Sequence, residues 1–394
     1  MTTYPINPNV FGALGVDGRP RLAALRVLAD QELFRYRSDA RPSWNDRLEQ
    51  SLADWSRCPA AVTVNSGTTG LRVALKAAGV SPGDHVLVSA YTFVATAMAV
   101  AALGAIPEPL DTDDVLGVDL DDLTARLHSK IRAVVVVHVQ GHLVDVSPVK
   151  ALLKPQGIAV VEDACQAFGA SSFGRPAGSM GDLGVFSFHQ AKQIAAGEGG
   201  AIVSQDRDLT AACARHVDMG ASRDAAGWPN WDDDTATLGE NCRLSELQAA
   251  VLCAQLEELP GALTRQRTIR RRIVDVLGHH GVPVAHSADP DGDSASHLLV
   301  PARTPEHARA IIKHAREHDV LARLVWDRPY YRHSVFHRAG LTPEQLAVAP
   351  ATRAEALAPR LLSLPMPASL PAEAAEHVAD VIAAAWHVEW KEQQ

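Results

Sequence analysis

Cysteine is scarce in this sequence, and its spacing suits neither a metal site nor a disulfide framework. The five cysteines are Cys58, Cys165, Cys213, Cys242 and Cys253, and no two of them form a CxxC pair. An odd number of cysteines in a chain of 394 residues favours reduced thiols. We therefore expect no metal site and a cytoplasmic location.

Three further features are missing, and each absence excludes a class of protein. Residues Met1–Pro5 contain no basic region followed by an apolar core, so we expect no export signal. The longest apolar stretch, Val94–Ile106, is too short to cross a bilayer. The formal net charge of −9 disfavours a general nucleic-acid binder, and the arginine-rich segment 265–272 fits a solvated helix face. We expect neither nucleic acid nor a membrane as a partner.

From about residue 60 the sequence alternates between short apolar strands and amphipathic helices. Segment 133–137 is apolar throughout, as expected for a parallel strand that is buried on both faces. Further strands are expected at 61–64, 86–88, 159–161, 184–188 and 201–203. This alternation predicts an α/β domain with a mostly parallel sheet. Ligands of such sheets bind at the carboxyl ends of the strands, where Ser66, Asp163 and Ser187 fall.

The second half of the chain predicts a smaller α/β domain. A helix that begins at 244 is expected to end near 259, because Pro260–Gly261 punctuates its pattern. After a second long helix, we expect strands at 297–300 and 321–326, a helix at 305–318 and a last helix from Ser369 to about Trp390. The predicted domains are residues 1–261, the amino-terminal segment with the large domain, and residues 262–394.

Lys192 is the most informative residue because of its neighbours. It follows the strand that ends near Ser187 and precedes the turn Gly197–Gly200, while Asp163 ends an upstream strand. A lysine can form a Schiff base with pyridoxal phosphate, an aspartate can pair with the ring nitrogen, and a serine can bind the phosphate. The alternatives are a surface lysine and an aspartate that merely caps a turn.

The segment Asn65–Gly70 lies between a predicted strand and a predicted helix. Its glycines let a phosphate approach the backbone, and its hydroxyls and amides can donate hydrogen bonds to that phosphate. A simple helix cap is the alternative. The sequence has neither a G-x-x-x-x-G-K-[ST] nor a G-x-G-x-x-G pattern, so no P-loop or Rossmann fingerprint competes with this segment.

Six motifs together resemble the DegT/DnrJ/EryC1/StrS aminotransferase family in order and spacing. They are residues 66–68, 91–96, 162–167, 178–182, 186–200 and 241–246. The resemblance extends from about residue 30 to 260, and residues 361–365 match more loosely. It implies fold type I of the pyridoxal-phosphate enzymes, an α/β fold with a mostly parallel seven-stranded sheet and a smaller carboxyl-terminal α/β domain. It also implies a homodimer with shared active sites.

The resemblance assigns a role to each matching position. Lys192 would be the Schiff-base lysine, and Asp163 would be the partner of the ring nitrogen. The other cofactor contacts would be Gln166 beside the ring, Phe93 on its face, Thr68, Thr69 and Ser187 at the phosphate, and Asn241 at the phosphate of the neighbouring subunit. Core packing is the alternative for Phe93, and a helix N-cap is the alternative for Asn241.

The implied activity is transfer of an amino group from L-glutamate or L-glutamine to a keto group of a sugar or cyclitol, in amino-sugar, aminocyclitol or antibiotic biosynthesis. The cofactor would alternate between pyridoxal 5'-phosphate and pyridoxamine 5'-phosphate. Segment 325–333 departs from the Tyr-x-Pro-x-His motif of many family members and, with segment 33–36, suggests cyclitol, carbasugar or aminobenzoate precursors. Tyr330, Tyr331 and Arg332 are therefore substrate candidates, with an exposed connection as the alternative. A second departure is Cys242, where the family usually has an aromatic residue.

Other outcomes are compatible with the same cofactor chemistry. Dehydration is disfavoured because family dehydratases carry histidine where Lys192 stands, whereas elimination or aromatisation would use the same residues. A non-catalytic regulatory paralogue would be expected to lose Lys192, Asp163 or the phosphate-binding segment, and this sequence keeps all three. The sequence specifies neither the ketone nor the amino donor.

Overall fold

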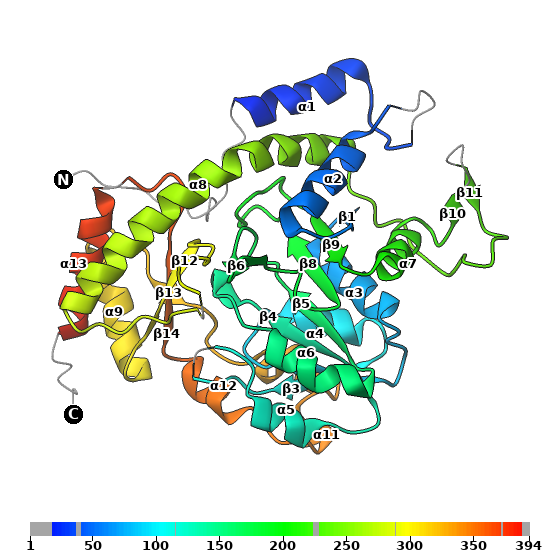
Figure 1. The fold of residues 1–394 in the computed structure, drawn as a ribbon. Coiled ribbons are helices and arrows are strands. Elements are labelled where there is room, and N and C mark those ends of the chain that lie inside the picture. Colours follow the sequence, from blue (N-terminus) through cyan, green and yellow to red (C-terminus); the bar gives the residue numbers. More distant parts are fainter. Residues whose placement is uncertain are drawn as a thin grey trace.

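A computed structural model describes residues 18–36, 41–114, 116–223, 228–287, 289–371 and 373–387. It contains a large sheet-centred part and a smaller part built around a second sheet (Figure 1). Met1–Pro5, where no export signal is expected, and the predicted helix end at Trp390 lie outside these residues. Within the described ranges, no helix combines the length and the apolar character needed to cross a membrane.

A seven-stranded sheet forms the centre of the large part. Its strand order is β1-β9-β8-β5-β4-β2-β3, and only β9 runs antiparallel to its neighbours. The strands are β1 (Ala60–Val64), β2 (His85–Ser89), β3 (Ile106–Leu110), β4 (Ile131–Val137), β5 (Ala159–Asp163), β8 (Leu183–Ser187) and β9 (Gly200–Ser204). All six strands expected from the sequence are present, and the predicted mostly parallel, seven-stranded α/β fold is confirmed.

The seventh strand, β3, is not among the strands expected from the sequence, and it contains Pro107 and Pro109. Proline cannot donate to a β-ladder, so sequence reasoning excludes it from the interior of a sheet. β3 lies at the edge of the sheet and pairs only with β2. An edge strand needs hydrogen bonds on one side only, which is why this position tolerates two prolines.

Alternate residues of β4 enter two separate hydrophobic cores, one on each face of the sheet. Val135 and Val137 belong to one core, together with apolar residues of α3, α4 and α7, while Val134 and Val136 belong to the other, with residues of α2, α6 and α8. Helices therefore cover both faces. They are α2 (Trp44–Ser56), α3 (Gly67–Ala77), α4 (Val94–Ala101), α5 (Leu120–Arg126), α6 (Ser147–Leu153), α7 (Arg207–Val217) and α8 (Glu246–His279).

Helix α8 connects the two parts of the molecule, and α1 (Arg19–Asp30) lies along it (Figure 1). The predicted end of this helix at Pro260–Gly261 is wrong, because α8 continues through Pro260. A proline inside a helix removes one backbone hydrogen bond and permits a bend, but the packing of α8 on both parts keeps it helical. Leu263 belongs to a core of the large part and Ile269 to the core of the small part. The domain boundary at 261/262 stays a prediction.

The small part is a three-stranded antiparallel sheet covered by α8, α9 and α13. The strand expected at 321–326 shortens to β13 (Arg323–Leu324), whereas the helix expected at 305–318 matches α9 (Pro305–Glu317). The other elements are β12 (His297–Pro301), η3 (Tyr330–Arg332), α10 (Ser334–Arg338), α11 (Pro343–Leu346), α12 (Thr352–Leu357), β14 (Leu361–Pro365) and α13 (Ala374–His387). Short segments outside both sheets are β6 (Ser171–Ser172), β7 (Arg175–Pro176), β10 (Ser222–Arg223), β11 (Pro229–Asn230), η1 (Val139–Gly141) and η2 (Lys154–Gln156).

Candidate active site

The amino terminus of α3 faces a cavity at the carboxyl end of the sheet. Ser66 caps this helix, since its hydroxyl oxygen accepts a hydrogen bond of 3.1 Å from the Thr69 backbone amide. Thr68 lies in the first turn and lines the cavity, as Ser66 and Gly67 do. A helix amino terminus presents free amides and a partial positive charge, so this corner of the cavity suits an anion.

Gly67 allows three segments to meet at that corner. A Cβ atom at this position would lie 2.8 Å from Cβ of Ser187 and 2.9 Å from Sγ of Cys165, which is closer than side chains pack. Ser187, the last residue of β8, therefore approaches the first turn of α3. Its buried hydroxyl group, the α3 amides and Thr68 together form a phosphate-sized cradle, which fits the role that the sequence predicts for this segment.

The Asp163 carboxylate is held in a fixed orientation at the end of β5. Its Oδ2 atom accepts a hydrogen bond of 2.7 Å from the Thr96 hydroxyl, and its Oδ1 atom accepts one of 3.1 Å from the Cys165 backbone amide. The Thr92 and Thr96 hydroxyls lie 2.9 Å apart and extend this contact into α4. Asp163 is almost fully buried yet lines the cavity. A carboxylate held in this way can stabilise a positive charge on a bound ligand.

Lys192 lies in the same cavity as Asp163, in the loop between β8 and β9. Burial lowers the pKa of the Lys192 amine below its ordinary value, while Cys165 and Asp163 oppose that shift. Burial also raises the pKa of the Cys165 thiol well above its usual range, so this thiol stays neutral near pH 7. Asp163 is therefore the negative charge next to the lysine. A partly desolvated lysine beside a carboxylate is suited to nucleophilic attack and to proton transfer.

The cavity that unites these groups has a volume of about 440 Å³. Six of the residues predicted to bind the cofactor line it: Thr68, Phe93, Asp163, Gln166, Ser187 and Lys192. The Gln166 side chain is anchored, since its Oε1 atom accepts a hydrogen bond of 3.2 Å from the Gln140 backbone amide. An amine, a carboxylate and an anion cradle in one cavity are the groups that an aldehyde-bearing pyridine phosphate requires. The residues present thus fit pyridoxal phosphate.

Two predicted cofactor contacts do not line this cavity within one chain. The Thr69 hydroxyl accepts a hydrogen bond of 2.9 Å from Ser66 instead. Asn241 is exposed and forms an isolated backbone bridge with Asp218. The Asn241 prediction concerns the cofactor of a neighbouring subunit, so its place outside this cavity is compatible with that role. Cys242, the departure noted above, is buried, and its sulfur accepts a contact of 3.8 Å from Arg72.

The predicted substrate residues lie beyond the cavity, and their polar groups have structural partners. The Tyr330 hydroxyl donates to the Pro107 carbonyl at 3.1 Å, and the Tyr331 hydroxyl donates to Glu355 at 2.9 Å. Arg332 contacts the same Glu355 carboxylate. Both tyrosines are fully buried, so the alternative of an exposed connection is wrong for them. Their role in substrate binding stays a prediction.

The sequence analysis did not identify the residues of the small part that line the cavity. Arg323, Val325 and Trp326 line the cavity from β13 and the loop after it. The Trp326 backbone is tied to the large part, because its amide donates to the Tyr91 hydroxyl oxygen at 3.3 Å. Arg323 and Trp326 stood in an expected strand, and that was the available signal in the sequence. The packing of the two parts brings them into one cavity with Lys192.

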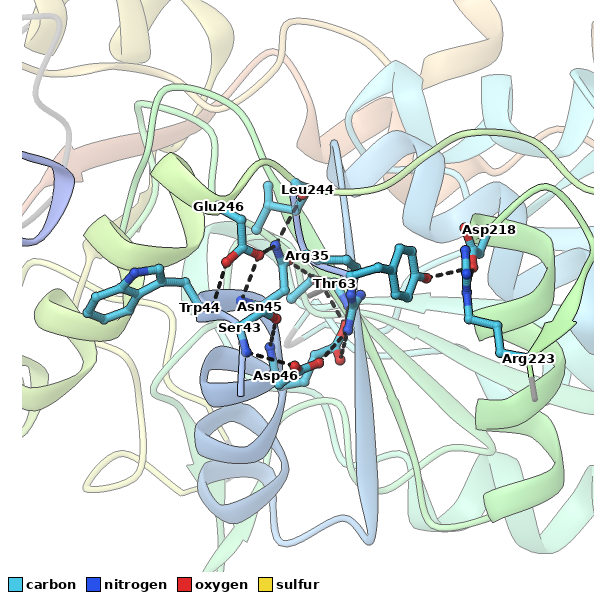
Figure 2. A network of polar contacts seen from close by, with 12 residues as sticks. Arg35, Ser43, Trp44, Asn45, Asp46, Thr63, Asp218, Arg223, Leu244 and Glu246 are labelled. Carbon is cyan, nitrogen blue, oxygen red and sulfur yellow. Dashed lines mark hydrogen bonds and ion pairs between the residues drawn. The ribbon is translucent and has the colours of Figure 1, made fainter. Parts of the chain in front are cut away.

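A polar network anchors the segment around Arg35 and Tyr36, and Asp218 and Arg223 are part of it (Figure 2). The Tyr36 hydroxyl donates to Asp218 at 2.5 Å, and the Arg223 guanidinium lies 3.4 Å above the Tyr36 ring. Burial, followed by the hydrogen bond to Asp218, raises the pKa of Tyr36 to about 12. Asp218 thus joins Tyr36 to the strand-like segment that carries Asn241.

The same network fixes the start of α2 against α8 (Figure 2). The Glu246 carboxylate accepts hydrogen bonds of 2.7 Å from the Trp44 amide and 2.6 Å from the Asn45 side chain. Arg35 binds Glu49 at 2.7 Å and Asp46 at 3.0 Å. These contacts hold Arg35 and the start of α2 against the large part.

Among the described residues, one group of three side chains has the composition of a metal site. His85 and His128 both contact the same oxygen of Glu108, the second at 3.1 Å. His85 begins β2, so the group lies at the amino end of that parallel strand, opposite the end that faces Lys192. Both imidazoles lie within contact distance of the buried Glu108 carboxylate and give it two polar partners. The expectation of no metal site stays a prediction.

Comparisons with known proteins agree with this geometry. The family model of the DegT/DnrJ/EryC1/StrS aminotransferase family matches residues 40–383. The chain is 32% identical over 344 residues to UDP-N-acetyl-3-dehydro-alpha-D-glucosamine 3-aminotransferase of Acidithiobacillus ferrooxidans, with 86% of this chain and 88% of that protein covered. It is 34% identical over 272 residues to L-glutamine:2-deoxy-scyllo-inosose aminotransferase of Streptomyces fradiae, with 66% and 63% covered.

Two further matches are a protein with a regulatory name and a solved structure. A protein named pleiotropic regulatory protein, from Geobacillus stearothermophilus, is 31% identical over 345 residues, with 86% of this chain and 88% of that protein covered. The crystal structure of S. venezuelae DesV in complex with a ketimine intermediate superposes with a TM-score of 0.81 at 27% identity, over 94% of this chain and 95% of that chain. The similarity thus includes both the large and the small part of the fold.

Proposed function

This chain belongs to the DegT/DnrJ/EryC1/StrS aminotransferase family, and on that premise we propose that it transfers an amino group from L-glutamate or L-glutamine to a keto group of a sugar or cyclitol. The observation that carries the proposal is the meeting of Lys192, Asp163, Ser187 and the amino terminus of α3 in one cavity of about 440 Å³. We further propose that pyridoxal 5'-phosphate binds there and that pyridoxamine 5'-phosphate is the amino-carrying form.

Each residue of the cavity has a distinct task. The bound cofactor supplies an aldehyde that receives the amino group and a ring that delocalises the electrons of the reacting carbon. Ser187, Thr68 and the amides of α3 bind the phosphate, since they converge where Gly67 leaves room. Asp163 would pair with the ring nitrogen and favour its protonated form, because a carboxylate held in place by Thr96 stabilises a nearby positive charge.

Lys192 holds the cofactor between turnovers and moves the proton during them. Its pKa is lowered by burial, so a larger fraction of its amine is unprotonated near neutral pH than for an exposed lysine. An unprotonated amine can accept a proton at Nζ, and the charged amine can return that proton to another carbon. The neighbouring Asp163 carboxylate stabilises the charged form between these two steps.

The substrate side of the cavity supports a polyhydroxylated acceptor. Phe93 and Trp326 offer apolar surfaces, and Arg323 and Gln140 offer polar groups that can bind hydroxyls. The names of the relatives supply one nucleotide-linked sugar and one cyclitol, and both are polyhydroxylated ketones or their derivatives. A role in amino-sugar, aminocyclitol or antibiotic biosynthesis follows from such an acceptor.

We also propose a homodimer with shared active sites and a cytoplasmic location. The exposed Asn241 supports the shared site, because its side chain lies outside the cavity of its own chain. Phe93, which is 54% exposed at the edge of the cavity, would be covered further by a second subunit. None of the five cysteines forms a disulfide, in keeping with a reducing compartment.

The amino-donor half of the reaction tests the proposal without knowledge of the ketone. The full chain is loaded with pyridoxal phosphate, and its absorbance is followed while L-glutamate or L-glutamine is added. We expect the visible band of lysine-bound cofactor to decrease as the corresponding 2-oxo acid forms, and Lys192→Ala to show no such band. Absence of any 2-oxo acid with both donors, in a chain that binds the cofactor, would exclude the aminotransferase and favour elimination, aromatisation or a regulatory role.

A further inference from the structure

His297, the first residue of β12, lies beside the catalytic lysine and has no role in the reaction described so far. It lines a second cavity of about 100 Å³ that adjoins the main one. Lys192, Gln166 and Arg323 line both cavities, so the two are continuous around the lysine. The second cavity is polar and large enough for a few water molecules at about 30 Å³ each.

Among the described residues, only one ring nitrogen of His297 has a hydrogen-bond partner. The Ser296 hydroxyl oxygen lies 3.1 Å from His297 Nδ1, 3.3 Å from the Gln140 carbonyl oxygen and 3.1 Å from the Ser294 hydroxyl oxygen. This hydroxyl has a single hydrogen, and donation to Gln140 leaves its oxygen able to accept from Nδ1. In that arrangement the imidazole proton is on Nδ1, and His297 Nε2 is an unprotonated acceptor.

That acceptor is buried and has no hydrogen-bond partner in the described residues. Burial, followed by the positive charges of Arg323 and Lys192, lowers the pKa of His297 to about 3, so the ring is neutral at physiological pH. The titratable groups that line these two cavities with Lys192 are Asp163 and Cys165 from β5 and the turn after it, His189 and Glu198 from the loop between β8 and β9, Arg323 from β13 and His297 from β12. The neutral His297 imidazole can accept a hydrogen bond without adding charge.

We propose that His297 is a positioning residue for Lys192, whose amino group donates a hydrogen bond to Nε2 of His297 directly or through one water molecule in the shared cavity. The imidazole holds the Lys192 amine in a fixed place beside the shared cavity. Ser296 supports this arrangement, because its oxygen lies where it can accept a hydrogen bond from Nδ1 of His297. The catalytic consequence rests on the proposed function, whereas the contact itself concerns the chain alone.

The test uses the cofactor-free full-length chain and measures the Lys192 amine itself. Trace acetic anhydride acetylates only unprotonated amines, so its rate of reaction with Lys192 as a function of pH, followed by mass spectrometry, reports the pKa of that amine. Loss of an acceptor for a charged donor should lower the pKa of Lys192 by roughly one unit, a tenfold change in the protonated fraction. We expect this shift in His297→Phe and in Ser296→Ala, and restoration in His297→Gln, which keeps an acceptor oxygen.

His307→Phe is the matched control, because His307 is also a histidine with an unpartnered Nε2 and a pKa lowered by burial, but it packs on Trp386 in the small part. This variant should leave the Lys192 profile unchanged. An unaltered profile in folded His297→Phe, or an equal shift in His307→Phe, would overturn the proposal. If His297→Phe does not fold, His297→Leu takes its place and is judged by the same outcomes. Failure of every amino donor would refute the proposed function without changing this measurement.

Discussion

The Thr96 hydroxyl donates a hydrogen bond of 2.7 Å to Oδ2 of Asp163 and so links the start of α4 to the end of β5. Thr96 is almost fully buried, and its hydroxyl also contacts Thr92 at 2.9 Å. Two donors orient this carboxylate, the Thr96 hydroxyl and the Cys165 backbone amide, and the first of them can be removed by substitution. Removal of the Thr96 hydroxyl changes how Asp163 is oriented but leaves its negative charge in place, so the two effects can be measured separately.

Thr96→Val replaces the donor with a methyl group of similar size. A hydrogen bond to a charged group contributes about 1.5 kcal/mol or more, so we expect kcat to fall roughly tenfold. Thr96→Ser keeps the hydroxyl and should stay within about threefold of the wild type. Steady-state kinetics of both variants with one donor and one acceptor provide the measurement. Equal activity of Thr96→Val and the wild type would show that Asp163 needs no support from α4.

Asp163→Asn removes the negative charge while the shape of the side chain is retained. The protonated ring nitrogen would lose its partner, so the barrier to proton removal from the substrate should rise by about 4 kcal/mol, roughly a thousandfold in rate. Single-turnover kinetics with the amino donor measure this step without the acceptor. A decrease smaller than about tenfold would identify the carboxylate as a turn cap.

Gly67→Ala should weaken cofactor binding through steric conflict. The added Cβ atom would lie 2.8 Å from Ser187 and 2.9 Å from Cys165, so β8 and the first turn of α3 would have to move apart. Overpacking of this kind costs about 1–3 kcal/mol, and we expect the Kd for pyridoxal phosphate to rise roughly tenfold or more. Gly278→Ala is the control, since nothing lies within 4 Å of the Cβ position there. Fluorescence titration of both variants compares the affinities, and equal Kd values would argue against a tight cradle.

The sequence was sufficient for the fold wherever one local pattern determined one element. Val134 and Val136 alternate with Val135 and Val137 between two cores, so an apolar run had to be a strand buried on both faces. The proline-rich strand β3 escaped prediction because its edge position is a property of the whole sheet. Helix α8 was predicted to stop at Pro260, since local propensity does not include its packing on both parts.

For the active site too, residues defined by a local pattern were predicted, and residues defined by long-range packing were not. Lys192, Asp163 and Ser187 were recognisable because each follows a strand of one parallel sheet, and the carboxyl ends of such strands meet. Arg323 and His297 were not, because their proximity to Lys192 depends on how the two parts of the molecule pack together. The hydroxyl chain from Ser294 to His297 depends on distances that no sequence motif records.

Lys192 also predicts how the stability of the cofactor-free protein depends on pH. Its pKa in the folded state is lowered by burial, whereas in the unfolded state it has the ordinary value near 10.5. Between these two pKa values the unfolded chain binds more protons, so the lysine makes the free energy of unfolding rise with pH in that window. Below the window the buried charge destabilises the fold.

Lys192→Met removes this destabilising charge and keeps the apolar stem. We therefore expect a higher Tm than for the wild type at pH 7, with the difference shrinking as the pH approaches the unfolded-state value near 10.5. Thermal unfolding of both cofactor-free proteins over this pH range gives the comparison. The exposed Lys313→Met serves as control, and its difference from the wild type should not change with pH. A constant difference for Lys192→Met would mean that the amine is solvated in the folded state.

The proposed sharing of active sites between two subunits can be tested by complementation. Asn241 lies outside the cavity that contains Lys192 of the same chain, so its proposed phosphate contact belongs to the neighbouring site. In a mixed dimer of Lys192→Ala and Asn241→Ala subunits, one site carries both changes and the other carries neither. Random exchange of equal amounts should restore about a quarter of the wild-type sites, because half of the dimers are mixed and each has one intact site. If exchange is verified by differently tagged subunits and activity stays at the level of the separate variants, each site is complete within one chain and Asn241 has only a structural role beside Asp218.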